Sequence, residues 1–166
     1  MNLPAGVVRV LGKSVKSFDS KKELEDLSSS SFSGYVVETL FGDLGLEESA
    51  LVFRQGQGLG CVYEYYGAKQ TLLGDDALVH IMNAYSAEHG VLDIVDLSVQ
   101  QVDLVTAFSP ALKLTKPISR GQFKSLVKDS FDANLSKSVG PARVADSLSK
   151  ESLFKKFGLA GIDGGK

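Results

Sequence analysis

The sequence predicts an α+β fold, in which helices pack on a largely antiparallel sheet of four or five strands and a basic helical extension follows at the C-terminus. Between residues 32 and 110, β-branched and aromatic residues form short runs that are separated by glycine-containing turns. Amphipathic stretches with capping residues lie among these runs. After residue 110 the net charge changes sign, which marks the extension.

We predict one domain over residues 1–132, with its most recognisable part at 32–110. A chain of 166 residues with 43% apolar residues fits a single globular domain. Residues 133–148 are rich in serine and alanine and contain a Gly-Pro pair, which is typical of a linker. Residues 149–166 are predicted to form a short helix and a frayed tail.

The first elements are a short strand from Val7 to Leu11 and a helix that begins at Ser20. Ser20 and Glu23 have the spacing of a capping box, in which each side chain hydrogen-bonds to the backbone of the other residue. The helix is expected to end between Ser28 and Ser31, because serine side chains compete for backbone hydrogen bonds.

Three strands follow, from Gly34 to Phe41, from Ala50 to Arg54 and from Leu59 to Tyr66. Gly56 and Gly58 are expected to supply the positive φ of a tight hairpin, so the second and third of these strands pair antiparallel. In the third strand, the alternate residues that begin at Leu59 are assigned to the core side; they are Leu59, Cys61, Tyr63 and Tyr65.

A helix is predicted from Gly74 to His89. Asp75 and Asp76 place negative charge at its N-terminus, and His89 with Gly90 provides a cationisable residue and a left-handed cap. Its buried stripe follows helical spacing and consists of Leu78, Ile81, Met82 and Tyr85.

A strand from Val91 to Leu97 and a further helix come next. Ser98 and Gln101 form another capping box at the start of that helix. The helix must end near Ser109, because Pro110 disfavours the helical conformation in the residue before it.

The extension begins with an edge strand from Lys113 to Ile118, after which Ser119 and Gln122 form a third capping box. The helix that starts there has an apolar side made of Phe123, Leu126, Val127 and Phe131. Its other side carries cations at four-residue spacing, namely Arg120, Lys124 and Lys128.

Charge is divided unevenly along the chain. Residues 1–110 hold 7 Lys and Arg against 15 Asp and Glu, a net charge of −8, whereas residues 111–166 hold 11 against 5, a net charge of +6. A basic C-terminal part on an acidic body favours contact with an acidic partner or with the chain's own domain, and simple solvation of two faces is equally compatible.

No group of side chains has the pattern of a catalytic, cofactor or metal site, so the sequence predicts that the protein is not an enzyme. The glycines near Gln55 precede a strand, whereas a dinucleotide-binding loop leads into a helix. His80 and His89 fall on different helix faces, and His80 is expected at the surface. The single cysteine, Cys61, forms neither an internal disulfide nor a zinc site, which needs about four ligands.

The function that these observations favour is a non-catalytic protein-interaction or adaptor module with the C-terminal extension as its docking element. The apolar side chains Leu153, Phe154 and Phe157 lie on a predicted helix too short to be stable alone, so they dock either on this domain or on a protein partner, which includes a second copy. The residues assigned to partner binding are Leu153, Phe154, Phe157, Arg120, Lys124 and Lys128.

Two alternative functions remain open. The first is a ribosome- or RNA-associated factor that binds through the basic residues at 113–128, which would make binding steeply salt-dependent. The second is a small-molecule-binding domain, with a site between the sheet and the 74–89 helix that is lined by Tyr63, Tyr65 and Tyr85. The N-terminus lacks a secretory signal and no apolar run is long enough to span a membrane, so a cytoplasmic location without membrane contact is expected.

Several short motifs resemble an archaeal family of conserved proteins of unknown function. They are Phe32-Ser-Gly-Tyr35, Ala50-Leu-Val-Phe-Arg-Gln-Gly56, Gly60-Cys-Val-Tyr-Glu64, Gly74-Asp-Asp-Ala-Leu78, Gly90-Val-Leu-Asp-Ile94, the opening at Met1 to Gly6 and the ending at Ser152 to Leu159. More distantly, the pattern is similar to the bacterial PATAN-type domain, and that resemblance implies an adaptor-like role in signalling. It transfers no catalytic residue.

Overall fold

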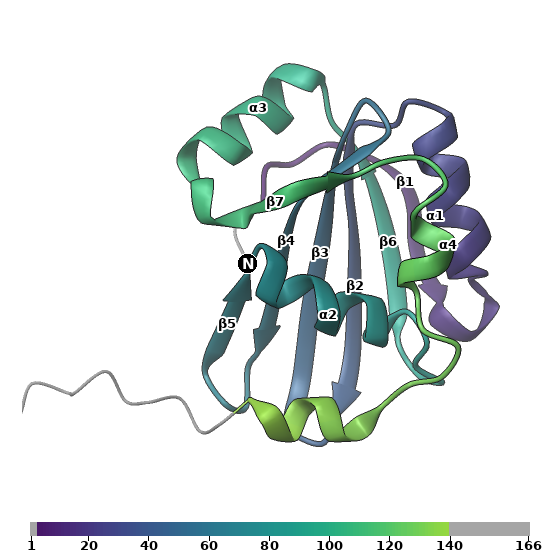
Figure 1. Cartoon of the computed structure of the whole chain (residues 1–166), viewed down its shortest axis with the longest axis vertical. Coiled ribbons are helices and arrows are strands. Elements are labelled where there is room, and N and C mark those ends of the chain that lie inside the picture. Colours follow the sequence, from purple (N-terminus) through teal and green to yellow (C-terminus); the bar gives the residue numbers. More distant parts are fainter. Residues whose placement is uncertain (1–2, 140–166) are drawn as a thin grey trace, which may run out of the picture.

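The computed structural model describes residues 3–139, which form an α+β domain with a seven-stranded antiparallel sheet and four α-helices (Figure 1). The predicted fold class is confirmed, whereas the predicted number of four or five strands is wrong. The strands are β1 Val7–Ser14, β2 Gly34–Gly42, β3 Gly45–Arg54, β4 Gln57–Tyr65, β5 Gln70–Leu73, β6 Val91–Asp96 and β7 Lys113–Ile118. The helices are α1 Ser20–Ser29, α2 Asp75–Ala84, α3 Val99–Phe108 and α4 Phe123–Leu126, with 3₁₀ turns η1 Val15–Ser17, η2 Pro110–Leu112 and η3 Ala133–Ser138.

The strands are arranged in the order β1-β6-β2-β3-β4-β5, and every pairing is antiparallel. Two short strands share the outer edge of β4. β7 pairs with it near Gly58 and Gly60, and β5 pairs with it from Val62 to Tyr65. The sequence did not reveal β5, because its four residues are too few to show an alternating pattern.

Helices cover the two sides of the sheet unequally. In Figure 1, α2 crosses the front of the sheet, with α1 and α4 side by side along its right-hand part. We call this side the α2 face; its core includes Val36, Leu51, Phe53, Cys61, Tyr63, Ile81, Ile94 and Phe123. The opposite side, the α3 face, is packed against α3 and η2 through Tyr35, Ala50, Val52, Val62, Val95, Val102 and Leu112.

The hairpin between β3 and β4 confirms the predicted antiparallel pairing but not the predicted pair of turn glycines. Gln55 and Gly56 have positive φ values of 49° and 83°. A Cβ atom at Gly56 would lie 2.2 Å from the carbonyl oxygen of Ser28, so both the turn and the close approach require glycine. Gly58 lies within β4, where its missing side chain leaves room for Ile118 and Phe123.

Helix α1 begins as predicted at Ser20, but its N-cap is Asp19 rather than Ser20. The carboxylate of Asp19 accepts a hydrogen bond of 3.1 Å from the backbone N–H of Lys22. The Ser20 hydroxyl instead donates to the carbonyl oxygen of Tyr85, at 2.9 Å. The predicted capping box is therefore wrong, because a tertiary contact takes the serine side chain away from the helix start.

Removal of the observed cap tests this assignment. Asp19→Ala is expected to lower the free energy of unfolding by about 1 kcal/mol, the usual loss for an N-cap residue. Lys22→Ala, one turn on and also exposed, should change it by less than about 0.5 kcal/mol. Urea denaturation of both variants makes the comparison, and equal stabilities would contradict the assignment.

Helix α2 starts as predicted after Gly74, but it ends at Ala84 rather than at His89. Contacts from distant parts of the chain replace the expected glycine cap. Ser20 donates to the carbonyl oxygen of Tyr85, and the Ser86 hydroxyl donates to that of Lys128, at 2.5 Å. Helix α3 agrees with its prediction at both ends, since Ser98 and Gln101 form a complete capping box and the helix stops at Phe108.

The segment after β7 is less helical than predicted. Helix α4 has only four residues, and Ser119 does not cap it, because its N-cap residue is Gln122. Residues 133–138, which the sequence analysis placed at the start of a linker, form η3, and Val139 is buried in the main core. The predicted C-terminal helix at 149–166 lies outside the described residues.

Candidate functional site

Polar side chains gather in the core beneath α2. Strand register places Glu38 of β2 opposite Ser49 of β3, and Ser49 opposite Tyr63 of β4. Residues that lie opposite each other in antiparallel strands point to the same face, so these side chains form one row across the α2 face. Together with neighbours on β3, β4 and α2 they make up the buried polar cluster: Glu38, Glu47, Ser49, Tyr63, Tyr65, His80 and Tyr85.

Two hydrogen bonds join part of this cluster. Tyr63 donates its hydroxyl to Glu47 at 2.5 Å, and the Tyr65 hydroxyl lies 2.6 Å from Nδ1 of His80. The rings of Tyr63 and Tyr65 pack with their centroids 4.8 Å apart. Other atoms in the cluster have no hydrogen-bond partner, namely both carboxyl oxygens of Glu38 and the hydroxyls of Ser49 and Tyr85.

Burial controls the charge of the cluster. It raises the pKa of Glu38 well above the ordinary value, and nearby Glu47 raises it further. Burial also raises the pKa of Glu47, although the hydrogen bond from Tyr63 acts in the opposite direction. The pKa of His80 is lowered, first by burial and then by Lys128, so the cluster favours neutral forms.

The enclosure of the cluster limits its chemistry. Tyr63, Tyr65 and Tyr85, which were predicted to line a small-molecule site, are almost fully buried and fill the space between α2 and the sheet. A ligand at that position would have to displace them. His80, expected at the surface, is only 9% exposed and lines a shallow pocket of about 340 Å³ beside β5.

The structure does not bring Arg120, Lys124 and Lys128 together on one helix face. Arg120 lies before α4, Lys124 lies within it, and Lys128 follows it. The helix is short because Gly121 before it has φ of 86° and Val127 after it is extended. The predicted basic row is therefore wrong as a geometric arrangement.

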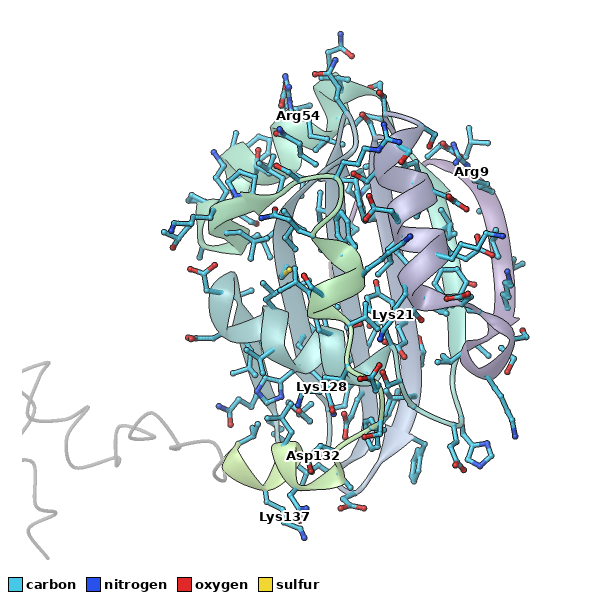
Figure 2. The ribbon with its side chains drawn as sticks, turned by 45° about the vertical axis from the view of Figure 1, so that its right-hand side comes forward. Arg9, Lys21, Arg54, Lys128, Asp132 and Lys137 are labelled. Atoms are coloured by element: carbon cyan, nitrogen blue, oxygen red, sulfur yellow. The ribbon has the colours of Figure 1, made fainter. Side chains whose placement is uncertain are left out.

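Acidic groups lie among these cations. Lys21 pairs with Asp129, and the Glu25 carboxylate accepts from the backbone N–H of Gly121 at 2.5 Å. Figure 2 shows Arg54 at the upper end of the molecule, Arg9 near its right-hand edge and Lys137 at the lower end. These three cations therefore lie apart from one another, whereas Lys21 and Lys128 are labelled near the middle of the molecule. The remaining predicted partner-binding residues, Leu153, Phe154 and Phe157, lie outside the described residues.

Among residues 3–139, no helix covers one part of the α3 face. Phe41 and Leu46, opposite each other at the end of the β2–β3 hairpin, are 81% and 45% exposed. The adjoining row carries the partly exposed Glu48 and Glu64. We call this surface the open sheet face and define it by Phe41, Leu46, Glu48, Glu64, Leu73, Val91 and Asp93, which strand register places on one side of the sheet.

A second exposed apolar feature lies on α3 itself. Leu104 and Phe108 follow each other by one helical turn and are 54% and 83% exposed. They line a groove of about 470 Å³ with Leu3, Pro4, Gln101, Val105 and Ser109. This groove carries no acidic side chain, which distinguishes it from the open sheet face.

Within residues 3–139, no group of three or more His, Cys, Asp or Glu is arranged to hold a metal ion. None of the described helices has the length and apolar content needed to cross a membrane.

Comparison with known proteins adds one relationship. The model of a family described as "Uncharacterized protein conserved in archaea (DUF2226)" matches residues 1–109. The matched part ends just after α3, so it includes the whole open sheet face, whereas β7, α4 and η3 lie beyond it. No curated protein and no solved structure matches the chain.

Proposed function

The chain belongs to the archaeal family DUF2226, and within this family we propose that it is a non-catalytic protein-interaction module, which binds a basic amphipathic segment of a protein partner on its open sheet face. The observation that carries the proposal is the combination of exposed apolar and acidic side chains there. Phe41 and Leu46 offer apolar surface directly beside the carboxylate of Glu48. An exposed apolar patch with charged neighbours is typical of an interaction surface.

The chemistry of the surface defines the partner. An amphipathic helix places its apolar side chains along one stripe and its lysines beside that stripe. Such a segment would bury its apolar side chains against Phe41, Leu46 and Val91, while its lysines meet Glu48 and Asp93. Because every residue of the open sheet face lies within the family-matched part, the proposal applies to the part that the family shares.

The non-catalytic part of the proposal is supported by the burial of the reactive groups. Cys61 is fully buried, and burial raises the pKa of its thiol, which keeps it protonated and unreactive. Glu38 and Glu47 are equally enclosed, and a general base must come within hydrogen-bond reach of its substrate.

The alternatives from the sequence remain predictions. RNA binding through 113–128 would rest on cations that do not share one helix face, and a steep loss of RNA binding with added salt is its expected sign. The distant likeness to PATAN-type adaptors is compatible with an interaction module. The expected cytoplasmic location is also a prediction.

A peptide-binding measurement tests the proposal. The protein is the full chain in which Leu153, Phe154 and Phe157 are all replaced by serine, called here the tail variant, so that its own apolar residues do not compete. The probe is a short fluorescent peptide of leucine, phenylalanine and lysine at amphipathic helical spacing. Fluorescence anisotropy should detect binding to the tail variant and none with a scrambled peptide of the same composition.

The surface is identified by further substitutions in the same background. Phe41→Ser with Leu46→Ser should weaken binding by at least about tenfold, because each buried apolar side chain contributes about 1.5 kcal/mol or more. Phe108→Ser, which removes an equally exposed phenylalanine from α3, should leave binding unchanged. Failure of the tail variant to bind the peptide would overturn the proposed function.

A further inference from the structure

The open sheet face and the chain's own C-terminal segment are complementary. Residues 149–158 contain the apolar Leu153, Phe154 and Phe157, and they hold three lysines against one glutamate, a net charge of +2. Residues 1–139 hold 13 Lys and Arg against 17 Asp and Glu, a net charge of −4. We propose that segment 149–158 occupies the open sheet face of its own molecule and thereby regulates access to it, an inference that rests on the proposed function.

The place where the described chain ends supports an intramolecular contact. Val139, its last residue, is buried and lines a pocket with Gln70 and Leu72 of β5. Val139 therefore lies at the β5 edge of the sheet. Leu73, the next residue of that strand, already belongs to the open sheet face on the other side.

The residues between Val139 and segment 149–158 are numerous enough for the segment to reach the open sheet face. Nine residues, 140–148, separate Val139 from the segment and span up to about 30 Å when extended. From β5, the strand β2 that carries Phe41 is three strands away, which is about 14 Å at the usual spacing of about 4.8 Å between strands. The segment can thus cross the open sheet face without strain in the connection.

The contact has a regulatory consequence. A segment tethered by a connection of this length is present at an effective concentration of about 1 mM. A segment whose intrinsic dissociation constant is about a tenth of that concentration would cover the surface about nine-tenths of the time and would weaken the binding of any partner about tenfold. A partner segment therefore has to displace the chain's own segment.

The first test compares the wild-type chain with the tail variant in the peptide-binding assay. The probe should bind the tail variant about tenfold more tightly than the wild-type chain, because the competing segment has lost its apolar side chains. Equal affinities would overturn this inference and leave the proposed function intact. Absence of binding to both proteins would instead overturn the proposed function.

A cross-linking test separates the chain's own segment from that of a second copy. Leu73→Cys with Phe154→Cys places one thiol on the open sheet face and one in the segment, and native Cys61 is buried and stays silent. Oxidation should give a disulfide-closed monomer at a rate independent of protein concentration. The control pair Lys22→Cys with Phe154→Cys, which uses α1 on the other side of the sheet, should not close. A disulfide-linked dimer, or no disulfide, would overturn the inference.

Discussion

Replacement of Phe123 by alanine is expected to lower the free energy of unfolding by about 3–5 kcal/mol, the usual loss when a buried phenylalanine is truncated. Phe123 is fully buried, and its ring stacks on that of Phe53 with centroids 5.3 Å apart. Phe53 in turn contacts Phe32, at 5.5 Å. This loss would be a large fraction of the roughly 5–15 kcal/mol that stabilises a typical domain.

The stability of Phe123→Ala shows whether the cooperatively folded part of the chain includes α4. Phe123 lies beyond the family-matched residues 1–109, yet it completes an aromatic stack with Phe53 of β3 and with Phe32, which lies just before β2. Urea denaturation of the full chain gives the measurement, with Leu126→Ala of the same helix as a control that should change stability by less than about 0.5 kcal/mol. A Phe123→Ala variant as stable as this control would show that α4 is not part of the cooperative core. Phe123→Leu should lie between the two, which keeps the test informative if the alanine variant fails to fold.

Replacement of Glu38 by methionine is expected to have a large effect in the opposite direction. The carboxyl of Glu38 is completely buried and neither oxygen has a hydrogen-bond partner. A buried carboxyl without a partner lowers the free energy of unfolding, because it has lost its hydrogen bonds to water. An apolar side chain of similar length removes this loss, so the variant should be more stable by roughly 1–3 kcal/mol near neutral pH. Glu88→Met, which makes the same change at an exposed position, should change stability by less than about 0.5 kcal/mol.

The stability that Glu38→Met gains over the wild-type chain should depend on pH in a defined direction. Burial raises the pKa of Glu38 in the folded state, whereas in the unfolded chain it stays near 4.5. Between these two values the folded state holds the proton more tightly, so wild-type stability is lost as the pH rises from 4.5 toward the folded-state pKa. The advantage of Glu38→Met should therefore grow over that range. Denaturation at a series of pH values checks this, and a constant difference would contradict the assigned cause.

A buried acid without a partner lowers the stability of the domain, and such groups are often retained at functional positions. Glu38 and Glu47 interrupt otherwise apolar strand patterns, and this was the available signal in the sequence for the buried polar cluster. The cluster could not be predicted from this signal, because an acid in a half-exposed strand is ordinary. Their burial by tertiary packing on the α2 face is what makes these two residues unusual.

The open sheet face could not be predicted from the sequence either. Its residues come from β2, β3, β4, β5 and β6, and none of their local patterns indicates that one part of the α3 face lacks a helix. The predicted basic row is a feature that the sequence indicated and the structure does not contain. The four-residue spacing of Arg120, Lys124 and Lys128 indicated a helix face, but the chain turns before Phe123 and again after Leu126.

What the sequence determined by itself were the elements that depend on hydrogen bonds between near neighbours. The capping box of Ser98 and Gln101, the stop before Pro110 and the antiparallel pairing of β3 with β4 across a short turn are all decided by residues a few positions apart. Tertiary structure decided the rest, including the cap of α1, the end of α2 at Ala84, the division of the β4 edge between β5 and β7, and the burial of Glu38. Each of these depends on groups far apart in the chain, such as Ser20 and Tyr85, whose contact exists only after the sheet has assembled.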